Sequence, residues 1–264
     1  MISKSRIKLI HSLEQKKFRK KEGLFVAEGP KIVSDLLYSG FKPRLLAGLH
    51  DYLKKNRAYI GNDRTTLNDI NTGDTEIYDI DEETLHKISF LQTPQQILGV
   101  FEIPPSSQKR LTPPTEDLSL VLDGVQDPGN LGTIIRIADW FGIDYVFCSP
   151  DTADAYNPKV VQATMGSIAH VRVVYTDLND LIDQLPTDFP VYGTFLDGDN
   201  IYQKELSGNG LIVMGNEGNG ISQALRKKIN NKLLIPSYKQ NTAESLNVAI
   251  ATAITCAEFR RRRL

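Results

Sequence analysis

The chain has 264 residues, with 31 Lys and Arg against 32 Asp and Glu, so its formal net charge is −1. Hydrophobic residues make up 41% and charged residues 24%, a globular balance that excludes a mostly disordered chain. No apolar run approaches the roughly 20 residues of a membrane span, and the first residues lack the apolar core of a signal peptide, so we expect no membrane association. The two cysteines, Cys148 and Cys256, have no metal-like spacing. They predict packing residues in a protein of a reducing compartment, the cytoplasm, without a disulfide or a metal site.

The near-zero net charge hides a basic segment at the start of the chain. Residues 1–31 hold nine basic against three acidic residues, whereas residues 117–264 hold 13 basic against 17 acidic. Such a segment is typical of a surface that docks a polyanion, and the plainer alternative is a solvated, lysine-rich helix face. The candidate contacts flank one aromatic residue, Phe18. They are Lys16, Lys17, Arg19, Lys20 and Lys21.

A proline-rich stretch divides the chain. Residues 103–115 contain four of the 13 prolines. Because proline fixes φ and donates no backbone hydrogen bond, this stretch predicts an extended, semi-rigid connector. We therefore expect a first domain over residues 1–103, a linker over 104–116 and a second domain over 117–264.

The first domain mixes helical and strand patterns. In chain order we expect a helix marked by Ile7, Ile10 and Leu13, a strand over 24–27, a helix over 32–37, strands over 45–47 and 58–60, a helix over 82–91 and a strand over 96–101. This order predicts a small α/β or α+β domain of a common size.

The second domain alternates apolar strands with helices. We expect strands over 118–122, 145–148, 171–175, 191–195, 211–214 and 233–235, and helices over 131–141, 158–166, 178–185, 222–229 and 243–260. The alternation predicts a mainly parallel sheet covered on both faces. Ligands of such sheets bind beyond the carboxyl ends of the strands. The segments to search therefore follow Leu122, Phe195, Met214 and Ile235.

The segment after Leu122 predicts a turn and a capped helix. Asp127 is followed by Pro-Gly, a turn sequence, and Asn130 is placed to cap the helix. Arg136 lies off the apolar stripe of that helix, close to its glycine-flanked start, where a ligand could approach. The alternative is a surface arginine paired with Asp139, worth only a few tenths of a kcal/mol.

The segment after Met214 contains glycines at 215, 218 and 220 around a single carboxylate, Glu217. Glycine permits positive φ and close backbone approach to a ligand. The order G-x-x-G-x-G differs from the dinucleotide fingerprint, and G-x-x-x-x-G-K-[ST] is absent, which disfavours a Rossmann-type nucleotide enzyme. A tight strand-to-helix turn alone would explain one of the three glycines.

The last helix begins with polar residues. Ser245, Leu246 and Asn247 precede an otherwise apolar run. Capping by Thr242 or Ser245 would explain one or two of the polar residues but not all of them.

Taken in order, D-x-x-x-D-P-x-N-x-G-x-x-x-R, G-N-E-G-x-G and I-P…S-L-N-V are similar to the three motifs of the SpoU-type, TrmH-like RNA ribose 2′-O-methyltransferases of the SPOUT superfamily. The resemblance spans residues 118 to the C-terminus. It implies an α/β domain with a parallel sheet and a deep trefoil knot. Residues 25–31 and 93–100 resemble that family's smaller N-terminal domain, a ribosomal-protein-like α/β fold that binds RNA.

The resemblance also implies a homodimer that methylates a ribose 2′-hydroxyl of structured RNA, with S-adenosylmethionine as cofactor and S-adenosylhomocysteine as product. A separate front domain favours ribosomal RNA over transfer RNA. The lysine-rich set above would then contact RNA. The implied cofactor contacts are Thr194, Gly215, Ile235 and Leu246. The implied catalytic residues are Asn130, Arg136, Glu217, Ser245 and Asn247.

The chemistry of methyl transfer suggests roles for these residues. A ribose 2′-hydroxyl is a weak acid and a poor nucleophile, so the enzyme must align it and remove its proton. We expect Arg136 to orient the hydroxyl, directly or with a substrate phosphate as proton acceptor, because guanidinium stays protonated. Asn130 and Asn247 would hold Arg136 and the ribose, Ser245 would bond nearby, and Glu217 would orient Asn130 or Arg136. The alternative is a non-catalytic RNA-binding or assembly factor on the same scaffold.

Overall fold

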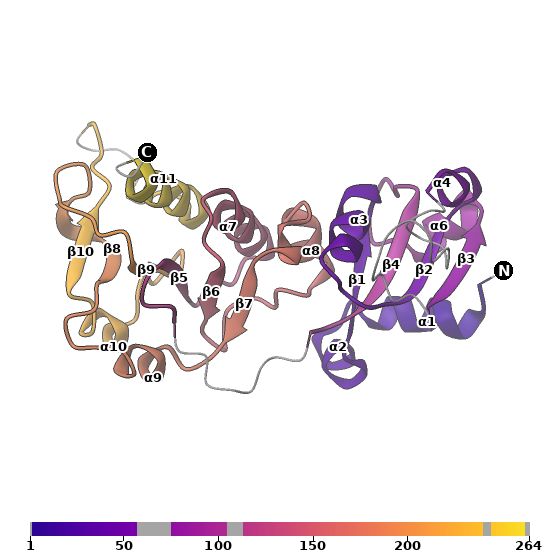
Figure 1. The fold of residues 1–264 in the computed structure, drawn as a ribbon, viewed down its shortest axis with the longest axis horizontal. Coiled ribbons are helices and arrows are strands. Elements are labelled where there is room, and N and C mark those ends of the chain that lie inside the picture. The colour runs from indigo at the N-terminus through magenta and orange to yellow at the C-terminus, as the bar shows by residue number, and fades with distance from the viewer. Residues whose placement is uncertain (1, 57–74, 105–112, 240–243, 262–264) are drawn as a thin grey trace. The chain divides into compact units, whose positions relative to one another are not determined.

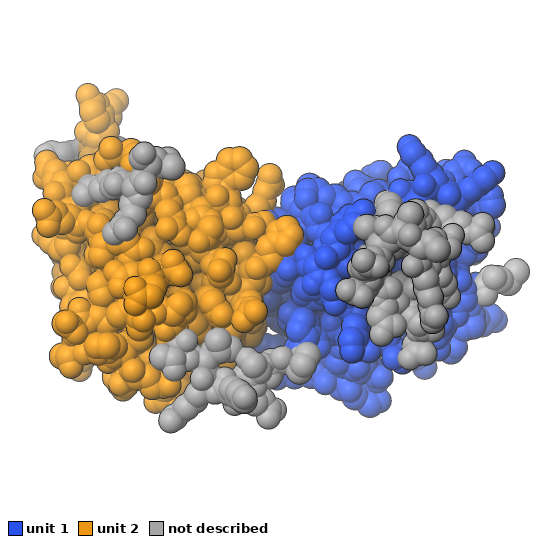
Figure 2. Space-filling model, viewed as in Figure 1, with its two compact units in different colours: residues 1–105, 154–169 blue, residues 106–153, 170–264 orange. Residues whose placement is uncertain are grey.

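The computed structural model describes residues 2–56, 75–104, 113–239 and 244–261. The chain forms two compact units: unit 1 contains residues 1–105 and 154–169, and unit 2 contains residues 106–153 and 170–264 (Figure 2). The expected strand over 58–60 and most of the proline-rich linker lie outside the described residues. Within the described residues, no helix is long and apolar enough to cross a membrane.

Unit 1 is built on a mixed four-stranded sheet in the order β1-β4-β2-β3 (Figure 1). The strands are β1 (Leu24–Glu28), β2 (Pro43–Leu49), β3 (Glu76–Ile80) and β4 (Ile97–Glu102). β4 runs antiparallel to β1 and β2, whereas β2 and β3 are parallel. The helices are α1 (Lys4–Ser12), α2 (Lys16–Glu22), α3 (Pro30–Tyr38), α4 (His50–Lys55) and α6 (Glu82–Ile88).

Residues 154–169 also belong to unit 1. They form α8 (Pro158–Ala163) and the short 3-10 helix η1 (Ser167–Ala169). The Tyr156 ring packs on Phe25 of β1 with 4.8 Å between centroids, and burial raises the pKa of Tyr156 to about 12. The chain therefore passes between the units at residues 153–154 and 169–170 as well as at the proline-rich linker.

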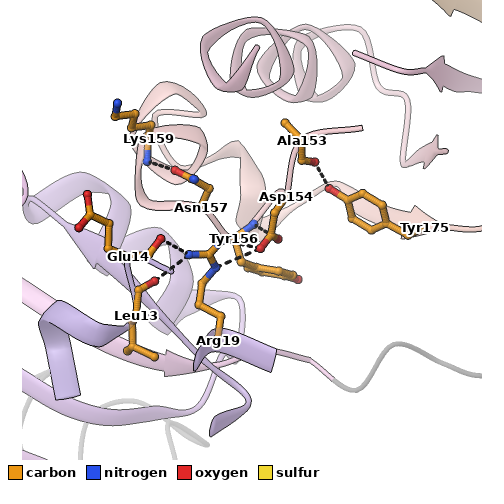
Figure 3. Close-up of polar contacts among 9 residues, drawn as sticks. All are labelled: Leu13, Glu14, Arg19, Ala153, Asp154, Tyr156, Asn157, Lys159 and Tyr175. Carbon is orange, nitrogen blue, oxygen red and sulfur yellow. Dashed lines mark hydrogen bonds and ion pairs between the residues drawn. The ribbon is translucent and has the colours of Figure 1, made fainter. Parts of the chain in front are cut away.

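Arg19 holds this segment to α2. Its side chain is almost fully buried, with only 1% of the residue exposed. Its Nη2 and Nε atoms donate to Asp154 Oδ2 at 2.6 and 3.0 Å, and its Nη1 donates to the carbonyls of Leu13 and Glu14 (Figure 3). The expectation that Arg19 contacts RNA is therefore wrong: its donors are used inside unit 1. The neighbouring lysines of α2 remain exposed.

Unit 2 confirms the predicted parallel sheet. Six strands in the order β10-β8-β9-β5-β6-β7 pair in parallel throughout. They are β5 (Leu118–Asp123), β6 (Tyr145–Cys148), β7 (Arg172–Tyr175), β8 (Val191–Asn200), β9 (Gly210–Gly215) and β10 (Asn231–Leu234). The trefoil threading stays a prediction.

Helices cover both faces of this sheet. They are α7 (Pro128–Trp140), α9 (Leu178–Asp183), α10 (Gln223–Arg226) and α11 (Val248–Arg261). α7 and α11 lie together on one side and α9 and α10 on the other (Figure 1). Leu181 and Leu225 of the second pair join Val121, Phe147 and Val213 of the strands in one buried cluster. This burial of apolar surface is the main force that holds the helices on the sheet.

The buried arginine leads to a stability prediction. Replacing Arg19 with Met keeps an apolar stem but leaves Asp154 and two carbonyls without their donor. Removing one partner of a buried pair costs about 3–5 kcal/mol. We expect the free energy of opening of the β1 backbone amides, measured by hydrogen exchange, to fall by this amount. The exposed neighbour Lys20, changed to Met, should alter it by less than about 0.5 kcal/mol. Equal effects of the two substitutions would contradict the structural role of Arg19.

Candidate active site

The segments that follow β5 and β9 meet because these strands are neighbours in the sheet. Leu122 pairs with Met214 and Asp123 with Gly215. Asp123 Oδ2 accepts from the Ser222 amide at 2.7 Å, which ties the first segment to the end of the second. The carboxyl edge of the sheet therefore brings the first two motifs together, as expected for an α/β ligand site.

Asn216 shapes the loop after β9. Its Oδ1 accepts from the amides of Gly218 and Asn219 at 2.9 and 3.0 Å, and its Nδ2 donates to the Gly124 carbonyl at 2.7 Å. Its backbone exchanges two hydrogen bonds with Gly220. Sequence reasoning gave Asn216 no role, although Asn before a glycine turn is a known signal of side-chain-to-backbone bonding.

The geometry of this loop requires glycine at two of its three glycine positions, Gly215 and Gly220. A Cβ on Gly215 would lie 2.3 Å from the Gly220 carbonyl carbon, and Gly220 has φ +67°. Both positions therefore require glycine for the turn itself. The expectation that a turn explains only one glycine is wrong. Gly218 has neither positive φ nor a close backbone neighbour.

Three of the predicted catalytic residues form one hydrogen-bonded chain. Asn130 Nδ2 donates to Glu217 Oε1 at 2.8 Å, and Asn247 Nδ2 donates to Asn130 Oδ1 at 2.9 Å. Asn247 Oδ1 in turn accepts from the amides of Ala249 and Ile250 at 2.9 and 3.3 Å. Each amide is held in one orientation by partners at both of its ends. We call this set the Glu217–Asn130–Asn247 chain.

The helix caps differ from those expected. Asp127, rather than Asn130, caps α7, since its Oδ1 accepts from the Asn130 amide at 2.7 Å and Pro128 starts the helix. α11 begins at Val248, not at residue 243, and its capping side chain is Asn247. Thr242 lies outside the described residues. These caps leave the Asn130 amide group available for the chain described above.

Arg136 lies on α7 with its side chain exposed. Asp139, its expected surface partner, instead contacts His170, with 3.2 Å between Oδ2 and Nδ1. Among the described residues, the side chains of Arg136 and Ser245 form no hydrogen bond or ion pair. The structure thus does not join these two to the Glu217–Asn130–Asn247 chain. It leaves all five guanidinium donors of Arg136 available to an anionic substrate.

The four predicted cofactor contacts come from neighbouring strands and their ends. Thr194 lies in β8, where its Oγ1 contacts Met214 Sδ at 3.9 Å, and Gly215 ends β9. The β8–β10 pairing shifts register between Lys232 and Leu233, just before Ile235. Leu246, which precedes α11, is 49% exposed. Ile235 is half-buried, so these positions offer apolar surface beside the end of the sheet.

Neither cysteine belongs to this site. Both are buried, and burial raises the pKa of the Cys148 and Cys256 thiols, that of Cys256 to about 12. A thiol that stays protonated is neither a nucleophile nor a metal ligand. Within the described ranges, no three His, Cys, Asp or Glu side chains are grouped so that they could hold a metal ion.

Comparison with known families covers both parts of the chain. The SpoU rRNA Methylase family matches residues 117–257, and the MRM3-like substrate binding domain matches residues 4–99. The first match contains every predicted catalytic and cofactor-binding residue. The second contains the lysine-rich helix α2.

Individual relatives resemble the chain over nearly its whole length. The 23S rRNA (guanosine(2553)-2′-O)-methyltransferase RlmP of Bacillus subtilis is 37% identical over 94% of this chain and 93% of its own. The AdoMet-bound rRNA methyltransferase structure from Sinorhizobium meliloti is 31% identical, with a TM-score of 0.86 over 100% of this chain and 97% of that one. The SpoU methyltransferase AviRb of Streptomyces viridochromogenes shares the fold, at 24% identity and a TM-score of 0.83 over 99% and 98% of the two chains. The chain belongs to the SpoU rRNA methylase family.

Proposed function

We propose that this protein transfers a methyl group from S-adenosylmethionine to a ribose 2′-hydroxyl of ribosomal RNA. The observation that carries the proposal is the Glu217–Asn130–Asn247 chain, which joins the three family motifs by side-chain hydrogen bonds. The Bacillus subtilis relative, a 23S rRNA 2′-O-methyltransferase, supports ribosomal RNA over transfer RNA. A bacterial ribosomal RNA substrate would put the protein in the cytoplasm.

The cofactor residues fit S-adenosylmethionine. The Sinorhizobium meliloti neighbour was solved with this cofactor. In the present chain, the apolar side chains of Ile235 and Leu246 and the backbone of Gly215 suit a ligand with an adenine ring and a hydrocarbon chain. Thr194 adds one hydroxyl. When bound, the cofactor supplies a methyl group on a positively charged sulfur, which is already a strong electrophile.

The chain's own residues must prepare the hydroxyl. We propose that Arg136 binds the ribose and its phosphate and orients the 2′-oxygen, while a phosphate oxygen accepts the proton that guanidinium cannot take. Asn130 and Asn247 would position the ribose, because their amides are already fixed by Glu217 and by the α11 cap. Ser245 would add a hydrogen bond. Preset donors of this kind lower the entropy lost when the reacting groups align.

The two parts of the chain would divide this work. We propose that residues 1–103 bind RNA and that residues 117–264 carry the methyl-transfer site, joined by residues 104–116. The match of residues 4–99 to an MRM3-like substrate binding domain supports the first role. Lys16, Lys17, Lys20 and Lys21 are the RNA contacts we propose, without Arg19.

We also propose that the protein is a homodimer that associates through α7 and α11. The side of α11 that is at least partly exposed carries only small or apolar residues before Arg260 and Arg261: Ile250, Ala251, Ala253, Ile254 and Ala257. Trp140 on the adjacent α7 is 84% exposed. An apolar face this continuous is rare on a monomer and typical of a subunit interface.

The first prediction concerns Arg136. Changing it to Ala should lower methyl transfer to ribosomal RNA by at least about a hundredfold, because the hydroxyl loses its orienting group. Binding of S-adenosylmethionine, measured by calorimetry, should stay within about twofold, since Arg136 is not among the cofactor contacts. The exposed Lys227, changed to Ala, is the matched control. Turnover of the Arg136 variant near that of wild type would contradict the assigned role.

The second prediction concerns the lysines of α2. Lys16 and Lys20, both changed to Gln, should weaken RNA binding and lower the slope of log K against log salt by roughly one per lost phosphate contact. The control is the same double change to Gln at Lys54 and Lys55 of α4, two exposed lysines of the same unit, which removes the same amount of charge. Identical slopes for the two double variants would remove α2 from the RNA-binding surface.

The third prediction concerns the dimer. Ile250 changed to Glu places a charge in the proposed interface and should shift the sedimentation of the protein toward the monomer at micromolar concentration, because burying an unpaired carboxylate is costly. Tyr202, half-exposed at 49% and outside α7 and α11, gives a control when changed to Glu. A wild-type protein that sediments as a monomer would refute the proposal directly.

A further inference from the structure

Unit 1 contains a cavity that the proposed methyl-transfer site does not use. Its volume is about 470 Å³. Four elements line it: the start of α3, the end of β2, helix α6 and the residues just before β4. The lining residues are Pro30, Leu49, Glu82, Leu85, His86, Pro94, Gln95 and Gln96.

The polar side chains of this cavity have unused hydrogen-bonding capacity. Glu82, His86, Gln95 and Gln96 are all exposed. None of these four side chains forms a hydrogen bond or ion pair with another residue in the part of the chain that the structure describes. They stand beside the apolar surfaces of Pro30, Leu49, Leu85 and Pro94. A concave site that brings several polar groups together beside apolar surface can hold and orient a small ligand.

The backbone around the cavity is firmly held. The Gln96 carbonyl accepts from the Leu49 amide at 2.8 Å, and the Ile97 carbonyl accepts from the Gly29 amide at 2.9 Å. Gln96 itself has φ +29°, which residues with side chains rarely adopt. Strain of this kind persists only where surrounding contacts impose it, and it is common at binding sites. The cavity walls are therefore set before any ligand arrives, which lowers the entropy cost of binding.

The charges of the lining select the ligand. The described residues that line the cavity include no lysine or arginine, and their one carboxylate, Glu82, would repel a phosphate. The apolar faces of a flat base suit contact with the proline and leucine surfaces of the lining. A carboxylate accepts two hydrogen bonds, and guanine presents two adjacent donors, N1–H and N2–H₂, on its pairing edge. The other three bases present one donor group there. The amide groups of Gln95 and Gln96 supply donors suited to guanine O6 and N7.

We propose that this cavity binds an unpaired guanine base of the RNA substrate, with Glu82 as the residue that recognises its pairing edge. Proteins read RNA sequence mainly through such splayed-out bases. The proposal rests on the proposed function, because it assumes that unit 1 engages RNA.

The test measures binding of the full-length protein to fluorescent RNA hairpins that differ only in their loops of guanine, adenine or uracil. Wild type should prefer the guanine loop by about tenfold, and Glu82→Gln should remove that preference. Gln95→Ala should reduce it several-fold through loss of a separate contact. The matched control is Glu83→Gln, one residue along α6, whose carboxylate pairs with Lys87 Nζ at 2.6 Å rather than lining the cavity.

Comparison with the Glu83 variant shows whether a change in RNA affinity comes from a specific contact or from the change in charge. Both glutamate substitutions remove one negative charge, so electrostatics alone would strengthen RNA binding equally in both. Weaker guanine-loop binding by Glu82→Gln alone therefore requires a specific contact. Equal preferences for all loops in wild type, or equal behaviour of the Glu82 and Glu83 variants, would overturn the cavity proposal.

A parallel assay separates this proposal from the proposed function. Methyl transfer from S-adenosylmethionine to ribosomal RNA is measured with the same wild-type preparation. Transfer without guanine preference overturns the cavity proposal and leaves the proposed function standing. Guanine preference without transfer overturns the proposed function and supports the cavity as a base-binding site.

Discussion

The candidate site depends on the parallel arrangement of the six strands in unit 2. Parallel strands end at the same edge, so β5 and β9, neighbours in the sheet, deliver Asn130 and Glu217 to one place although they are 87 residues apart in sequence. Asn247 lies 117 residues from Asn130. Each hydrogen bond between these residues contributes only about 1 kcal/mol net, less than the entropy cost of closing such loops. The buried sheet therefore positions the site, and the hydrogen bonds orient it.

The predicted parallel sheet followed from apolar runs that are buried on both faces, and this signal is strong because the same residues form the core. The elements that were missed lack it. α2 has the sequence K-K-F-R-K-K-E, and its one buried residue is an arginine. β3, at the edge of its sheet, alternates half-buried and exposed positions and has one buried residue, Ile80, at its end. The spacing of hydrophobic residues cannot predict α2, because the only residue that this helix buries is charged. It cannot predict β3 either, because an edge strand buries too few residues to give a clear pattern.

The sequence identified the residues of the Glu217–Asn130–Asn247 chain through the family resemblance, but not their bonds to one another. Those bonds depend on where two helices begin. Asp127 caps α7 and so releases Asn130, while Asn247 caps α11 with its oxygen and keeps its NH₂ group for Asn130. Several polar residues near each helix start could have served as the cap. The choice is made by tertiary packing, which a single sequence does not contain.

The structure reduces the number of basic residues in the N-terminal segment, residues 1–31, that can contact RNA. Of its nine basic residues, Arg19 is bonded to Asp154 and to two backbone carbonyls. Arg6 forms an ion pair with Glu76, and Lys31 forms one with Asp35. The cations that can meet a polyanion are thus mainly lysines, whose flexible stems suit phosphate contacts that carry no sequence information. Base recognition needs other groups, and the uncharged amides and single carboxylate that line the unit 1 cavity have the right chemistry. Arg19 would then serve RNA binding indirectly, by fixing the helix that presents the lysines.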